Sequence, residues 1–294
     1  MPEIYTYEEL SPPLRVQIVH IIKDTFGEDS YSFDASSSVY KFIHKALCKE
    51  YGVFTLKEHA GSDAEAVLDY FLNCTDYEQC LDVIEMSFRI IANHVADNYQ
   101  SYKRRTTSSQ DPDDAIEELN KRFKENGVGY EFVSGELIRI DSQFIHSETV
   151  KPVLSLLKIN KVYSGANEEF LKAHEHYRHK RYKECLVESL KSLESLMKGI
   201  CKQHSWGFKE SDSAKKLINV CLDKKLVPEY LQNQFSSLRI VLESGVPTIR
   251  NKEGGHGQGA VVSSVPEHLA SYTLHLTASN LLFLMQCNEQ LTKK

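Results

Sequence analysis

The residues of this chain best suited to chemistry lie within Ser244–Ala260, where an arginine, an asparagine and a histidine fall within seven positions. Arg250 carries a permanent charge on a planar fork of N–H donors, which suits a phosphate group. His256 titrates near neutral pH and can accept or donate a proton. With Asn251 beside the arginine, the spacing suits phosphoryl transfer without a metal ion, in which His256 moves the proton and Arg250 stabilises charge on phosphorus.

Glycines surround the histidine in Gly254–Gly259, a run that superficially resembles a nucleotide-binding motif. Its context excludes a P-loop or a dinucleotide-binding turn, because it follows a helical pattern and Pro247 rather than a strand, and no Lys-Ser or Lys-Thr pair follows it. Glycines here would let a substrate backbone approach closely. We expect Gln258 and Lys252 to contact substrate from this loop, although Lys252 equally fits an exposed loop side chain.

Two serines, Ser263 and Ser264, follow the loop and come just before the last helical pattern. Free N–H groups at the start of a helix favour an anion, so we expect both serines to help bind a substrate phosphate. An arginine and a histidine this close together are common, however. Their spacing alone fits equally well a mobile loop whose histidine is incidental.

Helical patterns from Asn167 onward predict an up-and-down bundle with this loop between its last two helices. We expect Asn167 to cap the first helix and Gly165 to break the chain before it, which puts a domain boundary between residues 163 and 164. Pro228 is expected to open the helix before the loop. The apolar positions expected to face inward are Phe170, Leu171, Ala173, His174 and Tyr177, then Leu186, Leu190, Leu193, Met197, Ile200 and Cys201, then Leu217, Ile218, Cys221 and Leu222, then Leu231, Phe235, Leu238 and Leu242, and finally Leu269, Tyr272, Leu276, Phe283 and Cys287.

Residues 1–163 predict a separate helical domain with one small hairpin. Ser36–Ser38 are expected to cap a helix in its first third. The hydrophobic period changes to two on both sides of Ser134-Gly135, which predicts a hairpin near residues 130–140. The fold class is therefore mainly α, with an N-terminal helical domain over residues 1–163 and a C-terminal helical bundle over residues 164–294. The apolar face expected for the longest N-terminal helix is Leu81, Ile84, Phe88, Ile91 and Val95.

Charge is distributed unevenly along the chain, whose formal net charge is −6. Residues 1–164 carry −10 and residues 165–294 carry +4, so the half that holds the loop is basic, which suits a polyanionic partner. Seven cysteines without a CxxC pair predict reduced, buried thiols in a cytoplasmic protein. No apolar run approaches the ~20 residues of a membrane helix, and the N-terminus lacks a secretory signal pattern.

The loop also resembles a known signature. Arg250-Asn251, four further residues and His256 resemble the pattern of arginine, polar residue, four to six residues and histidine in HEPN domains, which are all-helical domains of defence and toxin systems. The stretch Val246–Gly259 resembles the abortive-infection C-terminal branch of that family, as do the helices from Asn167 onward, including Ser192–Lys198. The resemblance covers about residues 165–294. The N-terminal half is similar, more weakly, to the helical N-terminal domains of AbiJ-type abortive-infection proteins.

This resemblance implies a metal-independent endoribonuclease with no cofactor. His256 would assist attack of a ribose 2′-hydroxyl on the adjacent phosphate, Arg250 would steady the developing charge, and Asn251 would orient the histidine or a phosphate. The partners it implies are RNA and a second protomer, since such sites usually form across a homodimer or higher homo-oligomer, together with an antitoxin or sensor subunit. Glu194, at the edge of an apolar stripe, would hold the fork of Arg250, although a structural ion pair elsewhere fits equally well.

Two alternatives of other classes stay open at this stage. One is a catalytically inactive HEPN module that binds RNA, a nucleotide or a protein partner, and the other is a helical interaction protein without a ligand. The weaker candidate groups are the histidines His174, His176 and His179, for which metal binding is disfavoured; the basic run Arg178, Lys180, Arg181 and Lys183, which fits RNA phosphates or a solvated helix end; and Trp206 and Phe208, which fit base stacking or a core role.

Overall fold

The fold is described from a computed structural model that covers residues 5–29, 35–226 and 265–293. It is mainly helical with one small hairpin, so the predicted fold class is confirmed. Packing divides the chain into two units, Met1–Leu137 and Ile138–Lys294. The boundary predicted at residues 163 and 164 concerns functional domains and stays a prediction.

The first unit contains helices and most of a hairpin. Its elements are α1 (Pro12–Phe26), α2 (Ala35–Tyr51), α3 (Asp63–Asn73), α4 (Tyr77–Ile90) with its π-helical continuation η1 (Ile91–Val95), α5 (Tyr99–Lys103), α6 (Pro112–Glu125) and β1 (Tyr130–Val133). The second strand of the hairpin, β2 (Glu136–Arg139), crosses the boundary between the two units.

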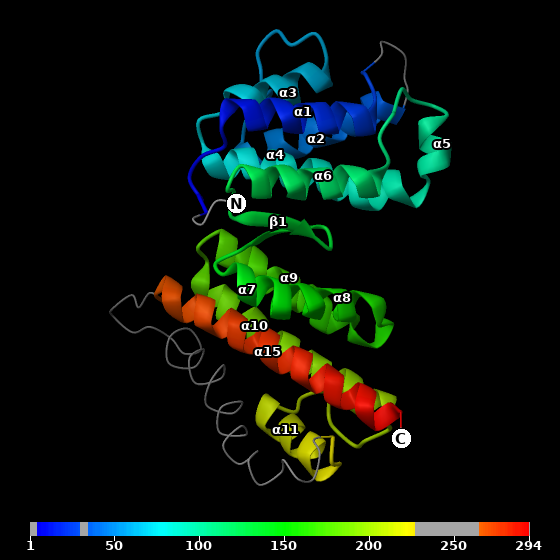
Figure 1. The fold of residues 1–294 in the computed structure, drawn as a ribbon, viewed down its shortest axis with the longest axis vertical. Helices are drawn as coiled ribbons and strands as arrows, with labels where there is room; N and C mark the ends of the chain where they lie inside the picture. The colour runs from blue at the N-terminus through cyan, green and yellow to red at the C-terminus, as the bar shows by residue number, and fades with distance from the viewer. Residues whose placement is uncertain (1–4, 30–34, 227–264, 294) are drawn as a thin grey trace. The chain divides into compact units, whose positions relative to one another are not determined.

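Local signals explain where α1 and α6 begin. Ser11 and Asp111 stand at their N-caps, and each is followed directly by a proline, whose fixed φ suits the first helical position. The Asp111 carboxylate accepts a hydrogen bond from the Asp113 amide at 3.0 Å. In Figure 1 α1 lies among α3, α4 and α6, and it packs against all three.

The core of the first unit follows the expected stripe of α4 and η1. Leu81, Ile84, Phe88, Ile91 and Val95 are all fully buried, which confirms that stripe. The expected cap of α2 is wrong, because that helix begins at Ala35 and Ser36–Ser38 lie in its first turn. Their hydroxyls serve another contact: Ser36 donates to the Glu28 carbonyl (2.9 Å), so it ties α2 to the chain that leaves α1.

The hairpin lies where the change of period predicted it. Ser134 and Gly135 form its two-residue turn with φ of 55° and 95°, the left-handed values of a type I′ turn. Asn120 of α6 holds β1 through both backbone groups of one residue, accepting from the Phe132 amide (2.7 Å) and donating to its carbonyl (2.9 Å). The Glu85 carboxylate of α4 accepts from the Leu137 amide (2.9 Å).

A pair of carboxyl groups sits beside the hairpin turn. Glu136 of β2 hydrogen-bonds Glu85, and its other partner is Arg89, at 2.6 Å between Nη2 and Oε2. Arg89 also donates to the Gly135 carbonyl. Burial first, and then the neighbouring Glu85 carboxylate, raise the pKa of Glu136 to about 7, although Arg89 opposes the shift. Arg89 is therefore the ion-pair partner of both carboxyl groups, and one of the two retains its proton near neutral pH.

The second unit is a bundle of helices. Its elements are α7 (Gln143–Ile145) with the π-helical turn η2 (His146–Val150), α8 (Lys151–Ile159), the 3-10 turn η3 (Lys161–Tyr163), α9 (Ser164–Arg178), α10 (Tyr182–Gln203), α11 (Ala214–Asp223) and α15 (Glu267–Thr292).

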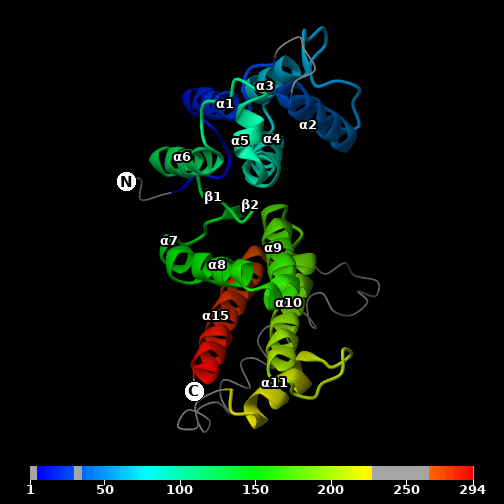
Figure 2. The same ribbon diagram turned by 90° about the vertical axis from the view of Figure 1, so that its right-hand side faces the viewer.

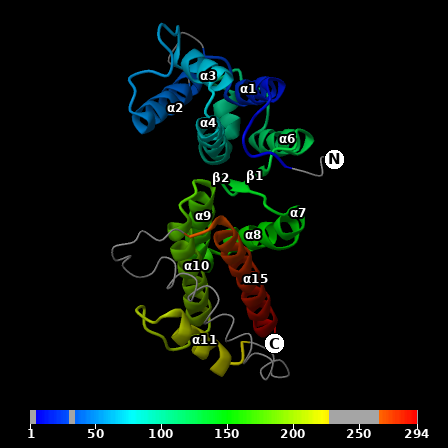
Figure 3. The ribbon, with the colours of Figure 1, turned by 90° about the vertical axis from the view of Figure 1, so that its left-hand side faces the viewer.

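Helix α10 organises this bundle. α9 and α15 pack along it, and α11 packs near its C-terminal end (Figure 2 and, from the other side, Figure 3). The stripe expected for α10 is confirmed, since all of its residues are buried: Leu186, Leu190, Leu193, Met197, Ile200 and Cys201. At helical spacing these residues form a continuous apolar face, and burying such a face is the main source of stability in a bundle.

The start of α9 differs from expectation. Gly165 and Asn167 lie inside the helix, so the predicted break and the predicted cap are both wrong. The capping side chain is that of Asn160, which accepts from the Val162 amide at 3.1 Å and begins η3, and this turn runs directly into α9. A glycine inside a helix costs only about 1 kcal/mol, which the packing of α9 against α10 outweighs.

The buried face of α15 also differs from expectation. Tyr272 is 53% exposed, and the residues that face the core include Thr273, Leu274, Thr277 and Leu281 instead. Of the predicted face, Cys287 is buried as expected, and the prediction failed elsewhere because this face is partly polar. Threonine hydroxyls can bond their own helix, as Thr273 does to the Leu269 carbonyl at 2.8 Å, so these residues can be buried without an apolar signal.

All seven cysteines are free, and only Cys74 is not fully buried. Within the described ranges, every helix is too short or too polar to cross a membrane.

Two helical glycines provide a test of packing in the second unit. A Cβ at Gly199 of α10 would lie 2.8 Å from the Val162 carbonyl oxygen, whereas at Gly165 the nearest atoms lie at 3.9 Å. We predict that Gly199→Ala lowers the free energy of unfolding by about 1–3 kcal/mol through overpacking. Gly165→Ala should raise it by up to about 1 kcal/mol, through helix propensity. Urea denaturation measures both, and a stabilising Gly199→Ala would refute the close contact.

The acid pair predicts a pH dependence of stability. The pKa of Glu136 rises from an ordinary 4.5 to about 7 in the folded protein, so the folded state holds more protons between these values and its stability falls as pH rises through this window. Glu136→Gln mimics the protonated acid and should make the protein more stable at pH 8, by roughly 2 kcal/mol, with little change at pH 5. Urea denaturation between pH 5 and 8 measures this, with Glu117→Gln as an exposed control. If the free energy of unfolding changed with pH equally in wild type and Glu136→Gln, the raised pKa of Glu136 would be contradicted.

Candidate functional site

All of the predicted site residues except Glu194 belong to one segment of the chain. Residues 227–264 lie outside the described residues, and they include Arg250, Asn251, Lys252, His256 and Gln258 as well as Ser263, Ser264 and the helix expected from Pro228. The roles of these residues stay predictions. The structure does describe the two places between which this segment runs, the end of α11 and the start of α15.

The leading end of the segment is held by α11. Leu217 and Cys221 of this helix are buried, and so is Leu226, the last described residue before the segment. The Leu226 amide donates to the Cys221 carbonyl at 3.0 Å, which closes the helix end. Leu226, the residue before the segment, is therefore fixed to the bundle through the contact of α11 with α10.

Glu194 fixes α11 at its other end. Its Oε1 accepts a hydrogen bond from the Ala214 amide at 3.0 Å, so this α10 carboxylate caps the first turn of α11. Ser213, the residue at the N-cap position, makes no capping bond of its own. A negative charge at a helix N-terminus is favourable because it satisfies a free amide and opposes the helix dipole. Among the described residues Glu194 forms no ion pair, so a pairing with Arg250 stays a prediction.

The returning end of the segment leads into α15, which is anchored by a polar network. Asp141 accepts hydrogen bonds from Tyr177 (2.5 Å) and from Ser271 of α15 (3.0 Å). Arg139 pairs with Asp141 at 2.9 Å and with Glu267, the first residue of α15, at 2.7 Å. The Arg139 guanidinium also lies over the Tyr177 ring, 5.3 Å from its centroid. Burial first, and then the Asp141 acceptor, raise the pKa of the Tyr177 hydroxyl, so it remains a hydrogen-bond donor.

Sequence reasoning missed this network. Asp141 and Ser271 are 130 positions apart, and neither belongs to a local motif. The sequence contained one indirect indication of it. Tyr177 was expected in the apolar core, and a buried tyrosine needs a hydrogen-bond partner for its hydroxyl.

The histidines of α9 do not converge on a common ligand. His174 is buried against Phe170, with ring centroids 4.7 Å apart, and burial first, then the nearby His146 and His275, lower its pKa to about 3. It is thus a neutral core residue. Within the part of the chain that the structure describes, no cluster of three or more His, Cys, Asp or Glu side chains is arranged to hold a metal ion.

The basic run at the end of α9 is only partly exposed. Arg178 is 2% exposed and bonds the His179 ring at 2.8 Å, so it is not available to RNA phosphates. Arg181 pairs with Glu175 at 3.1 Å. Trp206 stacks on His204 with centroids 4.8 Å apart, and His204 bonds Asn288 of α15, which favours the structural interpretation of this tryptophan.

Comparison with known proteins gives two matches that together cover most of the chain. A family model described as AbiJ N-terminal domain 4 matches residues 1–155. A model described as a HEPN-like domain matches residues 164–288, which include the whole of Ser244–Ala260. No curated protein matches the chain, and no solved structure matches it.

The capping role of Glu194 can be tested against Ser213. We predict that Glu194→Ala lowers the free energy of unfolding by about 1 kcal/mol, while Ser213→Ala costs much less, because only the glutamate bonds the free amide of α11. Glu194→Gln keeps an acceptor and should be nearly as stable as wild type. Thermal denaturation checks these values, and a Ser213→Ala loss as large as that of Glu194→Ala would contradict the assignment.

Proposed function

Since the chain belongs to the abortive-infection family defined by AbiJ N-terminal domain 4 and carries a HEPN-like domain after it, we propose that it is a metal-independent endoribonuclease effector. The observation that carries this proposal is the HEPN-like match over residues 164–288, which encloses an intact Arg250-Asn251 pair and His256.

The proposed reaction needs only side-chain chemistry. His256 accepts the proton of a ribose 2′-hydroxyl, whose oxygen attacks the adjacent phosphorus. The bond from phosphorus to the 5′-oxygen breaks, and that oxygen takes up a proton. The products then carry a 2′,3′-cyclic phosphate and a 5′-hydroxyl. Arg250 stabilises the charge that accumulates on the phosphoryl oxygens, since a planar guanidinium can donate two parallel hydrogen bonds to them.

The other predicted residues have supporting roles in this proposal. Asn251 orients His256 or a phosphate oxygen, and Lys252, Gln258, Ser263 and Ser264 contact the RNA backbone. The positive balance of the C-terminal half supports a polyanionic substrate. The site is completed by a second protomer of the same chain, and the reaction takes place in the cytoplasm.

The two anchored ends of the segment support a positioned site. The Glu194 cap and the Asp141 network fasten the elements on either side of residues 227–264. Acid–base catalysis depends on such support, because a misplacement of about 1 Å can cost on the order of 100-fold in rate.

Site variants test the proposal directly. With purified full-length protein and total RNA in the presence of EDTA, we predict that His256→Ala lowers the cleavage rate by about 10²–10⁴-fold. Arg250→Ala should lower it by about 10²–10³-fold. His268→Ala, at an exposed position early in α15, is the matched control and should cleave at the wild-type rate. The pH–rate profile of the wild type should show a group that titrates near neutral pH.

The same experiment separates the proposal from an inactive HEPN module. Cleavage that EDTA abolishes, or that His256→Ala leaves unchanged, would contradict the mechanism. RNA binding without cleavage, equal in wild type and His256→Ala, would instead favour a binding module.

A further inference from the structure

The first unit contains a pocket that the proposed ribonuclease reaction does not use. It has a volume of about 350 Å³, which is within the size range of small-molecule sites. Its walls come from the loop after α2, the C-terminal half of α3 and the start of α4. The lining residues are Leu56, Lys57, Asp69, Tyr70, Asn73, Cys74, Thr75 and Gln79.

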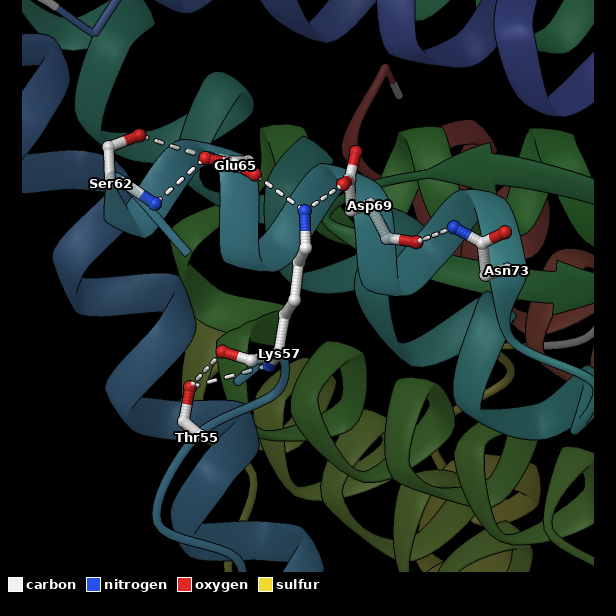
Figure 4. Close-up of polar contacts among 7 residues, drawn as sticks. Thr55, Lys57, Ser62, Glu65, Asp69 and Asn73 are labelled. Carbon is white, nitrogen blue, oxygen red and sulfur yellow. Dashed lines mark hydrogen bonds and ion pairs between the residues drawn. The ribbon is translucent and has the colours of Figure 1, made fainter. Parts of the chain in front are cut away.

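The one cation of the lining is already engaged. Lys57 reaches from the loop to α3, where its ammonium lies between two carboxylates one helical turn apart (Figure 4). It donates to Glu65 Oε1 at 2.5 Å and also to Asp69 Oδ2. Two acids and one lysine leave a local charge of −1. An anionic ligand, such as one that carries phosphate, is therefore disfavoured here.

Most of the unused polar atoms in the lining are hydrogen-bond acceptors. Asp69 uses Oδ2 for Lys57, and its Oδ1 forms no hydrogen bond with the described residues. Asn73 donates its amide nitrogen to the Asp69 carbonyl at 2.8 Å, which leaves its Oδ1 as the free atom. The Thr75 hydroxyl adds an acceptor that can also donate. A complementary ligand must supply N–H or O–H donors.

One side chain of the lining presents a donor. The Oε1 atom of Gln79 accepts hydrogen bonds from the Tyr70 hydroxyl and, at 3.7 Å, from the Cys74 thiol. These bonds fix the orientation of the amide, so its NH₂ group is the free end. The ligand must therefore carry an acceptor close to its donors, which an aliphatic amine does not. Leu56 and Tyr70 add apolar surface to the lining.

The walls are held in place without a ligand. His44 accepts the Leu56 amide at 3.2 Å, and its other ring nitrogen lies 2.6 Å from Asp63. The Gly61 amide donates to Glu65 at 2.8 Å, which fastens the far end of the loop to α3. A pocket built in this way loses little conformational entropy on binding.

We propose that this pocket binds a small, phosphate-free molecule with an exocyclic amino group and a neighbouring acceptor on a flat ring, the chemistry of an amino-bearing nucleobase or nucleoside. The amino group donates to Asp69 Oδ1 and Asn73 Oδ1, the ring acceptor receives the Gln79 amide, and the ring lies against Leu56 and Tyr70. The first unit thereby gains a ligand site that is separate in chemistry from the proposed RNA-cleaving segment.

The test compares nucleosides that carry the exocyclic amino group with counterparts that lack it. Calorimetric titration of the full-length protein with adenosine, guanosine and cytidine should detect binding of at least one at millimolar concentration. The counterparts without the amino group, inosine for the purines and uridine for cytidine, should bind at least about tenfold more weakly. The 5′-triphosphate of the best nucleoside should bind more weakly than the nucleoside itself, because of the local negative charge.

Two variants locate the binding on the pocket. Asp69→Asn removes the charged acceptor at nearly constant shape and should weaken binding at least about tenfold. Glu65→Gln is the matched control, since it alters the same Lys57 contact without lining the pocket, and it should keep binding within about twofold. Thermal denaturation confirms that both variants are folded.

Several results would overturn the assignment. They are no binding of any nucleoside, equal binding of the amino and deaminated members of a pair, tighter binding of the triphosphate, or equal binding by wild type and Asp69→Asn. Each readout is binding, so it stands or falls independently of RNA cleavage.

Discussion

The burial of one apolar face of α10 is the constraint on which the second unit depends. α9, α11 and α15 all pack against this helix. The η3 backbone lies so close to Gly199 that there is room for its hydrogen atoms but not for a Cβ. The contacts that hold the elements on either side of residues 227–264 derive from this packing. Glu194 can cap α11 only because α10 presents it at the edge of the apolar face, and the Asp141 network can hold α15 only because the bundle brings Tyr177 and Ser271 together.

Periodicity was informative wherever the buried face of a helix is mostly apolar. The stripes of α4 and α10 were predictable because each is apolar and faces one core. Ser134-Gly135 was predictable because a two-residue hairpin turn demands left-handed backbone angles. The face of α15 was not predictable, because buried threonines belong to it, one of which, Thr273, bonds the Leu269 carbonyl of its own helix. The start of α9 was not predictable from Gly165, because the packing of α9 against α10 outweighs the cost of a glycine inside the helix.

The chemical site was predictable to a different extent. Arg250, Asn251 and His256 stand out from the sequence because they match a family signature, whereas the residues that hold the elements on either side of residues 227–264 do not. Glu194 was noticed for its place beside an apolar stripe, yet its capping of α11 depends on a tertiary contact that no local pattern records. Asp141 and Arg139 gave no signal at all, since their partners in α15, Ser271 and Glu267, lie more than 100 positions away.

In the proposed mechanism the ribose 2′-hydroxyl is the nucleophile and His256 receives its proton. The most direct measurement uses an RNA that the protein cuts at one position, and a second copy that has a single 2′-deoxy nucleotide on the 5′ side of that bond. We expect the first RNA to yield a 2′,3′-cyclic phosphate and a 5′-hydroxyl, while the second stays intact. Cleavage of the 2′-deoxy copy, or products with a 5′-phosphate, would contradict it.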